Sequence, residues 1–258
     1  MKYQYVIRMQ YLGFRYSGWQ RQPGQKTVEG MVRKTLKFIL GDIPFRVLAA
    51  GRTDAKVSAL AAAVALYLDE ELHMDGEEFI SLFNRNLPPD IRALDISSVP
   101  TEFNIIKDSS IKEYTYLFST GQKIHPFCAP IMACIHEQLD IPLMISAASL
   151  FVGTHDFSAY TVKQKGLKDP NRTVTLCELA LNTRWQASFF PEQSYLLQIR
   201  AEGFMRYQVR MIMGALIELG RGNISLDQVR ASLEPGNDTR WTYVAPGSGL
   251  ALNHLEFG

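Results

Sequence analysis

Residues 51–55, Gly-Arg-Thr-Asp-Ala, place a guanidinium group two positions from a carboxylate, directly after the apolar segment 45–50. Glycine lets the backbone turn sharply there, and loops at strand ends are where folds display reactive groups. Because Arg52 favours the ionised form of Asp54, this carboxylate suits a nucleophile or a counter-ion. The five residues alone also describe an ordinary surface turn with an ion pair, so the rest of the chain must decide.

Six further short segments form an ordered set with this one. They are GWQRQ at 18–22, NLPPDI at 86–91, KEYTY at 112–116, GTHDFS at 153–158, FMRYQVRMIMG at 204–214 and APGSGL at 245–250. In this order and spacing the seven segments resemble the tRNA pseudouridine synthase A family, and the resemblance covers nearly the whole chain.

The resemblance implies an isomerase that converts uridine to pseudouridine in tRNA, with the anticodon stem-loop, positions 38–40, as its expected target. The reaction breaks the bond between uracil N1 and ribose C1′, rotates the base and rejoins it through C5, so no cofactor is consumed. By the same resemblance Asp54 is the catalytic aspartate and Arg52 the arginine linked to base flipping. Tyr114 matches the tyrosine that packs against the uracil, and Arg210 the arginine that pairs with the carboxylate.

The resemblance also implies an α+β fold made of two ferredoxin-like, RRM-like halves. Their strands are expected to join into one continuous mixed or antiparallel sheet, with helices on one face and a central active-site cleft. Residues 1–104 would form the half with the catalytic loop, and residues 105–258 the half with the tyrosine and arginine of the cleft. The family further implies a homodimer.

Periodicity in the chain predicts alternating strands and helices. Residues 3–11 have the period of a half-buried strand, and residues 204–219 keep helical spacing of apolar side chains. Arg206 and Arg210 lie four apart on that predicted helix, so both can point from one face towards a cleft; a solvent-facing pair on a core helix has the same spacing. Further strands are predicted at 45–50, 62–68, 91–99, 111–119, 173–181 and 194–201, and further helices after Thr27, Asp75, Asp140 and Ser225.

The net charge of +1 conceals an uneven distribution. Residues 1–60 hold eleven Lys and Arg against three Asp and Glu, whereas residues 61–102 hold two against nine. Local basic stretches suit phosphate contacts, because each neutralised phosphate releases counterions; solvated helix faces are the alternative. The cations expected to contact RNA are Arg21, Lys56, Lys107, Lys112, Lys163, Lys165, Lys168 and Arg206.

Other classes of protein find little support in the composition. No apolar run is long enough to span a bilayer, and the N-terminal residues lack a secretory core, so a cytoplasmic protein is expected. The three cysteines form no C-x-x-C pair and the five histidines lack ligand spacing, which argues against a disulfide framework or a metal site. His155 and Asp156 are adjacent, and neighbouring side chains seldom face each other, so we expect a role in a turn.

The chain departs from the family at substrate-facing positions. After Asp54 the family has Ala-Gly-Val-His, whereas this chain has Ala-Lys-Val-Ser. If that glycine position needs a positive φ, Lys56 strains the loop; with an ordinary φ the lysine adds a phosphate contact. Ser58 removes a ring that could stack, and Ile106 replaces an expected arginine, with Lys107 beside it.

Because of these departures, the sequence leaves three functions open. The first is a pseudouridine synthase acting on tRNA or on a different RNA. The second is a non-catalytic RNA-binding paralogue that kept the cleft. The third is an aspartate-dependent hydrolase of a nucleoside bond, which would need a positioned water.

Overall fold

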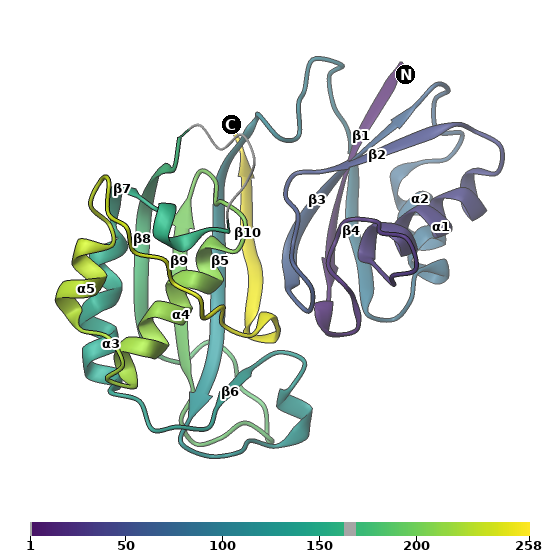
Figure 1. Ribbon diagram of the computed structural model, residues 1–258. Coiled ribbons are helices and arrows are strands. Elements are labelled where there is room, and N and C mark those ends of the chain that lie inside the picture. The colour runs from purple at the N-terminus through teal and green to yellow at the C-terminus, as the bar shows by residue number, and fades with distance from the viewer. Residues whose placement is uncertain (1, 163–168) are drawn as a thin grey trace. The chain divides into compact units, whose positions relative to one another are not determined.

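The computed structural model describes residues 2–162 and 169–258, which form an α+β chain with both parallel and antiparallel strand pairs (Figure 1). Two compact units are present: unit 1 runs to Ser110 and includes Ala251–Gly258, and unit 2 is Ile111–Leu250. The lysines at 163, 165 and 168 lie outside the described residues. The predicted division into domains 1–104 and 105–258 stays a prediction.

The bounds of the elements are as follows. The strands are β1 (Tyr3–Tyr11), β2 (Phe45–Ala49), β3 (Ser58–Leu68), β4 (Ile91–Ser98), β5 (Ser109–Thr120), β6 (Ala133–Ile135), β7 (Gly153–Asp156), β8 (Asn171–Leu181), β9 (Tyr195–Ala201) and β10 (Leu250–Phe257). The α-helices are α1 (Val28–Leu40), α2 (Gly76–Asn86), α3 (Ile141–Ala148), α4 (Gln208–Gly220) and α5 (Leu226–Ala231). Short 3₁₀ helices are η1 (Gly13–Arg15), η2 (Pro126–Cys128), η3 (Ser149–Phe151), η4 (Ser158–Tyr160) and η5 (Gly247–Gly249).

In unit 1 the long strand β3 has three partners. It runs antiparallel to β1, which in turn pairs antiparallel with β4. On its other edge β3 pairs with β10 in parallel at its start, where Ser58 lies opposite Ala251, and with β2 antiparallel at its end, where Leu68 lies opposite Phe45. The start of β3, immediately after the Asp54 loop, is therefore fixed by strands on both edges.

The prediction that β1 is half-buried is correct for only part of the strand, because Gln4 and Val6 on its polar side are buried whereas Arg8 is exposed. Val6 and Ile7 point to opposite faces, yet they are 4% and 1% exposed. On the Val6 side the cover includes Ile105, and Gln4 is buried there by donating its Nε2–H to the Phe103 carbonyl (2.9 Å). The strand itself was predicted correctly; the segment that covers its polar side gave no periodic signal.

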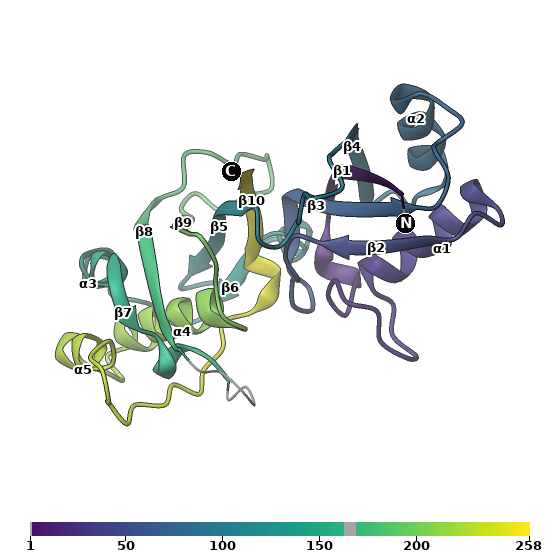
Figure 2. The same cartoon turned by 90° about the horizontal axis from the view of Figure 1, so that it is seen from above.

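Helix caps agree with the sequence pattern. Thr27 accepts a hydrogen bond from Gly30 N at the start of α1 (3.2 Å), and Asp75 accepts one from Glu78 N at the start of α2 (2.8 Å). These bonds satisfy amide groups that a helix leaves without partners at its first turn. Figure 2 shows both helices packed beside the unit 1 sheet.

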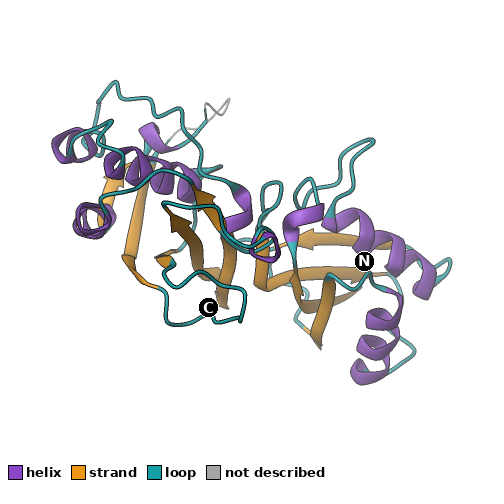
Figure 3. Ribbon diagram, turned by 90° about the horizontal axis from the view of Figure 1, so that it is seen from below, coloured by secondary structure: helices purple, strands orange, loops and turns teal. Residues whose placement is uncertain are grey.

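In unit 2 the strands follow the order β5-β9-β8-β7, all antiparallel, and β6 pairs in parallel with the end of β5. Helices α3, α4 and α5 gather on one side of this sheet (Figure 3). β10 gave no strand prediction, nor did the short strands β6 and β7. His155 and Asp156, which lie on β7, serve the local chain: His155 Nε2 lies 3.0 Å from the Val152 carbonyl, and Asp156 accepts from Ser158 N (2.7 Å).

The predicted helix 204–219 begins four residues late. Tyr207 has a left-handed backbone conformation, φ +64°, and α4 begins after it at Gln208. Apolar spacing does not report such a break, because Met205 is buried although it precedes the helix. The prediction that Arg206 and Arg210 share one helical face is therefore wrong.

Candidate active site

The loop that carries Arg52 and Asp54 connects β2 to β3 and is held by the segment 13–19. Trp19 N donates to the Thr53 carbonyl (3.0 Å), and Lys56 N donates to the Tyr16 carbonyl (3.0 Å). Arg52 is exposed and Asp54 is half-buried. The loop is thus fixed by main-chain bonds on both sides of its carboxylate.

Two glycines allow this close approach of backbone to backbone. A Cβ on Gly18, whose φ is +96°, would lie 2.7 Å from the Thr53 carbonyl oxygen. A Cβ on Gly13 would lie 1.9 Å from the Val57 carbonyl oxygen. Gly18 of the GWQRQ motif therefore has a geometric role, because it lets the loop that bears Asp54 rest directly on the chain before α1.

The side chain of Thr53 is anchored as well. It is 8% exposed, and its hydroxyl lies 2.8 Å from the Tyr11 hydroxyl at the end of β1. The Tyr11 ring packs at 6.0 Å from the ring of Trp19, which is 3% exposed. Residue 53 thus points into the core, while its neighbours on both sides reach the surface.

Of the two backbone conformations considered for Lys56, the structure shows the strained one, with a positive φ. Its φ is +66°, in the left-handed region that costs a side-chain-bearing residue about 1–2 kcal/mol. Its ammonium lies 5.6 Å from the centre of the Phe14 ring. Ser58, the second departure, accepts a hydrogen bond from Gly13 N (2.9 Å), so its hydroxyl serves the brace beneath the loop.

In unit 2, Tyr114 lies on β5 opposite Ile199 and is 9% exposed. Its ring meets that of Phe204 edge to face, with centroids 5.4 Å apart and an interplanar angle of 84°. Phe204 was predicted to be helical, as part of the FMRYQVR segment, but it lies before α4, which begins at Gln208. The non-helical chain there places the Phe204 ring against Tyr114 of β5.

Arg210 lies in the first turn of α4 and is tied to the APGSGL segment. Its Nε donates to the Ala245 carbonyl (2.8 Å), and Ala245 N donates back to the Arg210 carbonyl (3.1 Å). Nearby, the Tyr116 hydroxyl donates to the Pro246 carbonyl (2.9 Å). Burial, reinforced by Tyr243, raises the pKa of Tyr116 well above its ordinary value, although the Arg210 guanidinium opposes the shift.

Tyr207, which was not among the predicted site residues, contacts two of them. The guanidinium carbons of Arg206 and Arg210 lie 4.9 and 5.2 Å from the centre of its ring. Stacking on aromatic rings is a favoured contact of arginine. The two arginines therefore do converge, on a ring rather than along a helix, and the signal available was an aromatic residue between them in the Arg-Tyr-Gln-Val-Arg run.

The other residues assigned to RNA contact lie in different surroundings. Arg21 and Lys107 are exposed, and their backbone amides donate to Glu29 and Asn104. Lys112 is half-buried, and desolvation lowers the pKa of its ammonium.

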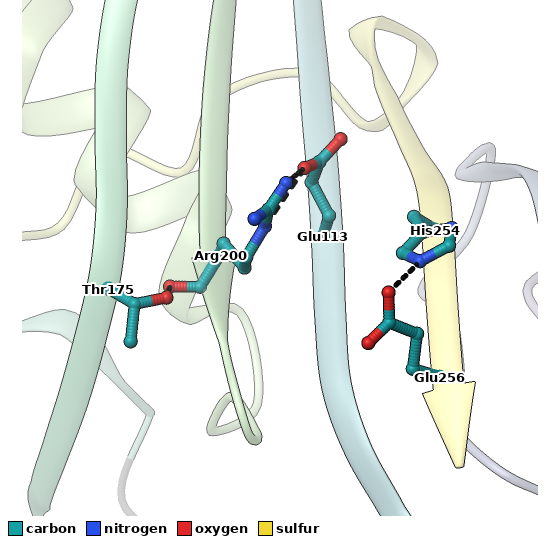
Figure 4. Close-up of polar contacts among 5 residues, drawn as sticks. All are labelled: Glu113, Thr175, Arg200, His254 and Glu256. Atoms are coloured by element: carbon teal, nitrogen blue, oxygen red, sulfur yellow. Dashed lines mark hydrogen bonds and ion pairs between the residues drawn. The ribbon is translucent and has the colours of Figure 1, made fainter. Parts of the chain in front are cut away.

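An ion pair that was not predicted involves Glu113, the residue before Tyr114; the Glu113 side chain is buried, whereas that of its partner Arg200 is 41% exposed. Glu113 is 3% exposed and accepts bonds at Oε2 from Arg200 Nη2 (2.5 Å) and Nε (3.1 Å), while Thr175 donates to the Arg200 carbonyl (3.3 Å) (Figure 4). Because side chains alternate along a strand, Glu113 and Tyr114 point to opposite faces of the unit 2 sheet. On β10, His254 Nε2 lies 2.6 Å from Glu256 Oε1.

Among residues 2–162 and 169–258, no group of three or more His, Cys, Asp or Glu side chains is arranged to hold a metal ion. Within the same residues no helix is both long and apolar enough to cross a membrane. Cys128, Cys134 and Cys177 are free thiols.

The chain is an α+β protein that carries the candidate carboxylate, Asp54, on a loop braced by main-chain hydrogen bonds. A model of the tRNA pseudouridine synthase family matches residues 147–258. The tRNA pseudouridine synthase A of Shouchella clausii is 32% identical over 253 residues, covering 98% of this chain and 93% of that protein. Those of Bacillus sp. strain KSM-64 and Dictyoglomus thermophilum are 31% and 29% identical, covering 98% and 97% of this chain and 99% and 98% of their own lengths. The chain belongs to the tRNA pseudouridine synthase A family.

Proposed function

We propose that this chain is a tRNA pseudouridine synthase that isomerises uridine to pseudouridine in the anticodon stem-loop, at positions 38–40. The observation that carries the proposal is Asp54, held on a braced loop in a chain that resembles tRNA pseudouridine synthase A proteins along nearly its whole length. The reaction needs no cofactor, because substrate and product are isomers: one C–N bond is exchanged for a C–C bond, and the proton lost from C5 is balanced by a proton gained at N1.

Each proposed catalytic group has a distinct role. The Asp54 carboxylate acts beside the sugar and the base while the N1–C1′ bond is broken and the C5–C1′ bond is formed. Tyr114 packs against the detached uracil and helps the C5 proton depart. Arg210 pairs with the carboxylate and keeps it ionised. Arg52, which is exposed, enters the space left when the target base leaves its stack.

We further propose that two ferredoxin-like halves, 1–104 and 105–258, join their sheets and place these groups in one central cleft. Support comes from the position of each group within its own unit: Asp54 on a loop at the start of β3, and Tyr114 and Arg210 on β5 and at the start of α4. The proposed cations that track the RNA backbone are Arg21, Lys56, Lys107, Lys112, Lys163, Lys165, Lys168 and Arg206.

The proposed setting of the enzyme is the cytoplasm, where it would act as a homodimer with one tRNA touching both subunits. Analytical ultracentrifugation with and without tRNA tests the dimer. A single species at the monomer mass in both samples would contradict it.

The function is tested by incubating the protein with unmodified tRNA transcripts and mapping pseudouridine at single-nucleotide resolution. We expect product at positions 38–40, and none in transcripts that carry cytidine there. Asp42→Ala is a matched control for Asp54→Ala, because Asp42 is fully exposed and pairs with Lys37 at the end of α1. Asp42→Ala should give wild-type yields of pseudouridine. If the wild-type protein formed pseudouridine only at positions other than 38–40, a different RNA target would be proposed instead.

A non-catalytic RNA-binding paralogue is the second candidate, and the left-handed Lys56 is the observation that favours it. A paralogue of this kind would bind tRNA equally well with and without Asp54→Ala, and would form no pseudouridine in either case. The hydrolase alternative would release free uracil, which chromatography of the same reactions detects.

A further inference from the structure

A chain of hydrogen bonds in unit 1 links the turn before β4 to the Asp54 loop through Tyr16. The Tyr16 hydroxyl donates to Asp90 Oδ1 (2.6 Å), and Arg15 Nε donates to Asp90 Oδ2 (2.8 Å). On the other side of the same residue, the Tyr16 carbonyl accepts from Lys56 N (3.0 Å). Lys56 follows Asp54 by two positions, so the LPPD segment and the catalytic loop are joined by a single residue.

The hydrogen bond between Tyr16 and Asp90 is strong and shielded from solvent. Tyr16 is 2% exposed, and the Asp90 side chain is 10% exposed. Desolvation pushes the pKa of Asp90 up, but the bonds from Tyr16 and Arg15 outweigh it and lower the pKa below its ordinary value. Burial, followed by the bond to Asp90, raises the pKa of Tyr16. Tyr16 therefore stays a protonated donor to an ionised acceptor, a pairing roughly twice as strong as a neutral hydrogen bond.

The loop needs such an anchor because its backbone is strained. Lys56 holds a φ of +66°, and strain of this kind persists only where the surrounding structure fixes it. The Tyr16 carbonyl receives the amide of the strained residue itself. We propose that Tyr16 and Asp90 are positioning residues that hold the strained loop so that Asp54 keeps its reactive geometry. The reaction concerned is the proposed isomerisation, so the inference rests on the proposed function.

The test compares Tyr16→Phe with Tyr5→Phe at saturating tRNA. Tyr5 is a matched control, because its hydroxyl also makes a hydrogen bond in unit 1, with Leu72 N (3.3 Å), away from the loop. For Tyr16→Phe we expect kcat to fall about tenfold, since small misplacements of a catalytic group are costly, while KM stays within about twofold. Tyr5→Phe should keep the wild-type kcat.

A second variant separates positioning from a general loss of structure. Lys56→Gly removes the left-handed strain, so adding it to Tyr16→Phe should restore kcat to within about threefold of Lys56→Gly alone. Measuring kcat at saturating tRNA removes the contribution of the lysine to binding. Lack of rescue would overturn the proposal, because relieving strain at residue 56 does not repair a merely structural defect.

Hydrogen exchange of the Lys56 amide provides a readout that needs no RNA. We expect it to exchange faster in Tyr16→Phe than in Tyr5→Phe and wild type, because its acceptor is loosened. Unchanged exchange would overturn the bracing role even if the wild type forms no pseudouridine, in which case the proposed function fails separately. A wild-type kcat for Tyr16→Phe in an active enzyme would overturn the inference and leave the proposed function intact.

Discussion

Gly18→Ala should damage both stability and catalysis, because the new methyl group would push directly on the Asp54 loop. The added Cβ would lie 2.7 Å from the Thr53 carbonyl oxygen, 0.7 Å inside the 3.4 Å at which ordinary contact begins. Neither side is a flexible side chain, so the loop or the segment 13–19 must move by several tenths of an ångström. The φ of +96° adds backbone strain, because L side chains rarely adopt it.

The expected loss of stability in Gly18→Ala follows from the backbone strain and the overpacking together. Strain of about 1–2 kcal/mol and overpacking of about 1–3 kcal/mol give a loss of roughly 2–5 kcal/mol in the free energy of unfolding. A shift of this size at the loop should lower kcat by about 10–100-fold, since 1 Å of misplacement costs about 100-fold.

Gly24→Ala is the matched control for this substitution. Gly24 also has a positive φ, +69°, but a Cβ there would meet nothing within 4 Å. It should therefore cost only the strain term, about 1 kcal/mol, and leave kcat unchanged. Urea unfolding measures the stabilities, and initial rates of pseudouridine formation measure kcat. If Gly18→Ala matched Gly24→Ala in both, the close approach of the loop would not matter and the reasoning would be refuted.

Three further predictions concern other parts of the molecule. Burial raises the pKa of Tyr160 to about 12, so wild-type stability should fall between pH 10 and 12 by roughly 2 kcal/mol more than that of Tyr160→Phe. Urea unfolding at each pH measures this difference, and parallel pH profiles would count against it. Gly214→Ala, whose Cβ would lie 2.2 Å from a backbone carbonyl, should destabilise the protein more than Gly220→Ala, whose Cβ would meet a flexible methionine at 2.6 Å, and thermal unfolding should rank them in that order. Lys56→Asn introduces a residue type that tolerates the left-handed region and should reduce the salt slope of tRNA binding by about 0.7–0.9. Lys34→Asn, on an exposed face of α1, should leave the slope unchanged. Equal slopes for the two variants would exclude a phosphate contact at residue 56.

Local chemistry in the sequence was sufficient to place most elements. Thr27, Asp75 and Ser225 were expected as helix caps, and each accepts the predicted hydrogen bond from the amide three residues on. Capping depends on residues a few positions apart, so the sequence carries the complete signal. Strands with a strong apolar pattern, such as β1 and β3, were found for the same reason.

Features that depend on distant parts of the chain were missed. The break before α4 at Tyr207 follows from a left-handed residue that the apolar spacing does not reveal. Glu113 and Arg200 are 87 residues apart in the sequence, and no local pattern predicts that they pair. Gly18 could be recognised as part of a motif, but its role became clear only when the Thr53 carbonyl was found beside it.

The conversion of uridine by Asp54→Asn tests the central claim most directly. Asparagine matches the size of aspartate but cannot supply an ionised carboxylate, so the loop and the RNA contacts should persist while the reaction stops. Single-turnover assays on unmodified tRNA should give no pseudouridine with Asp54→Asn, whereas tRNA affinity stays within about threefold of wild type. Pseudouridine formation by Asp54→Asn at the wild-type rate would contradict the account.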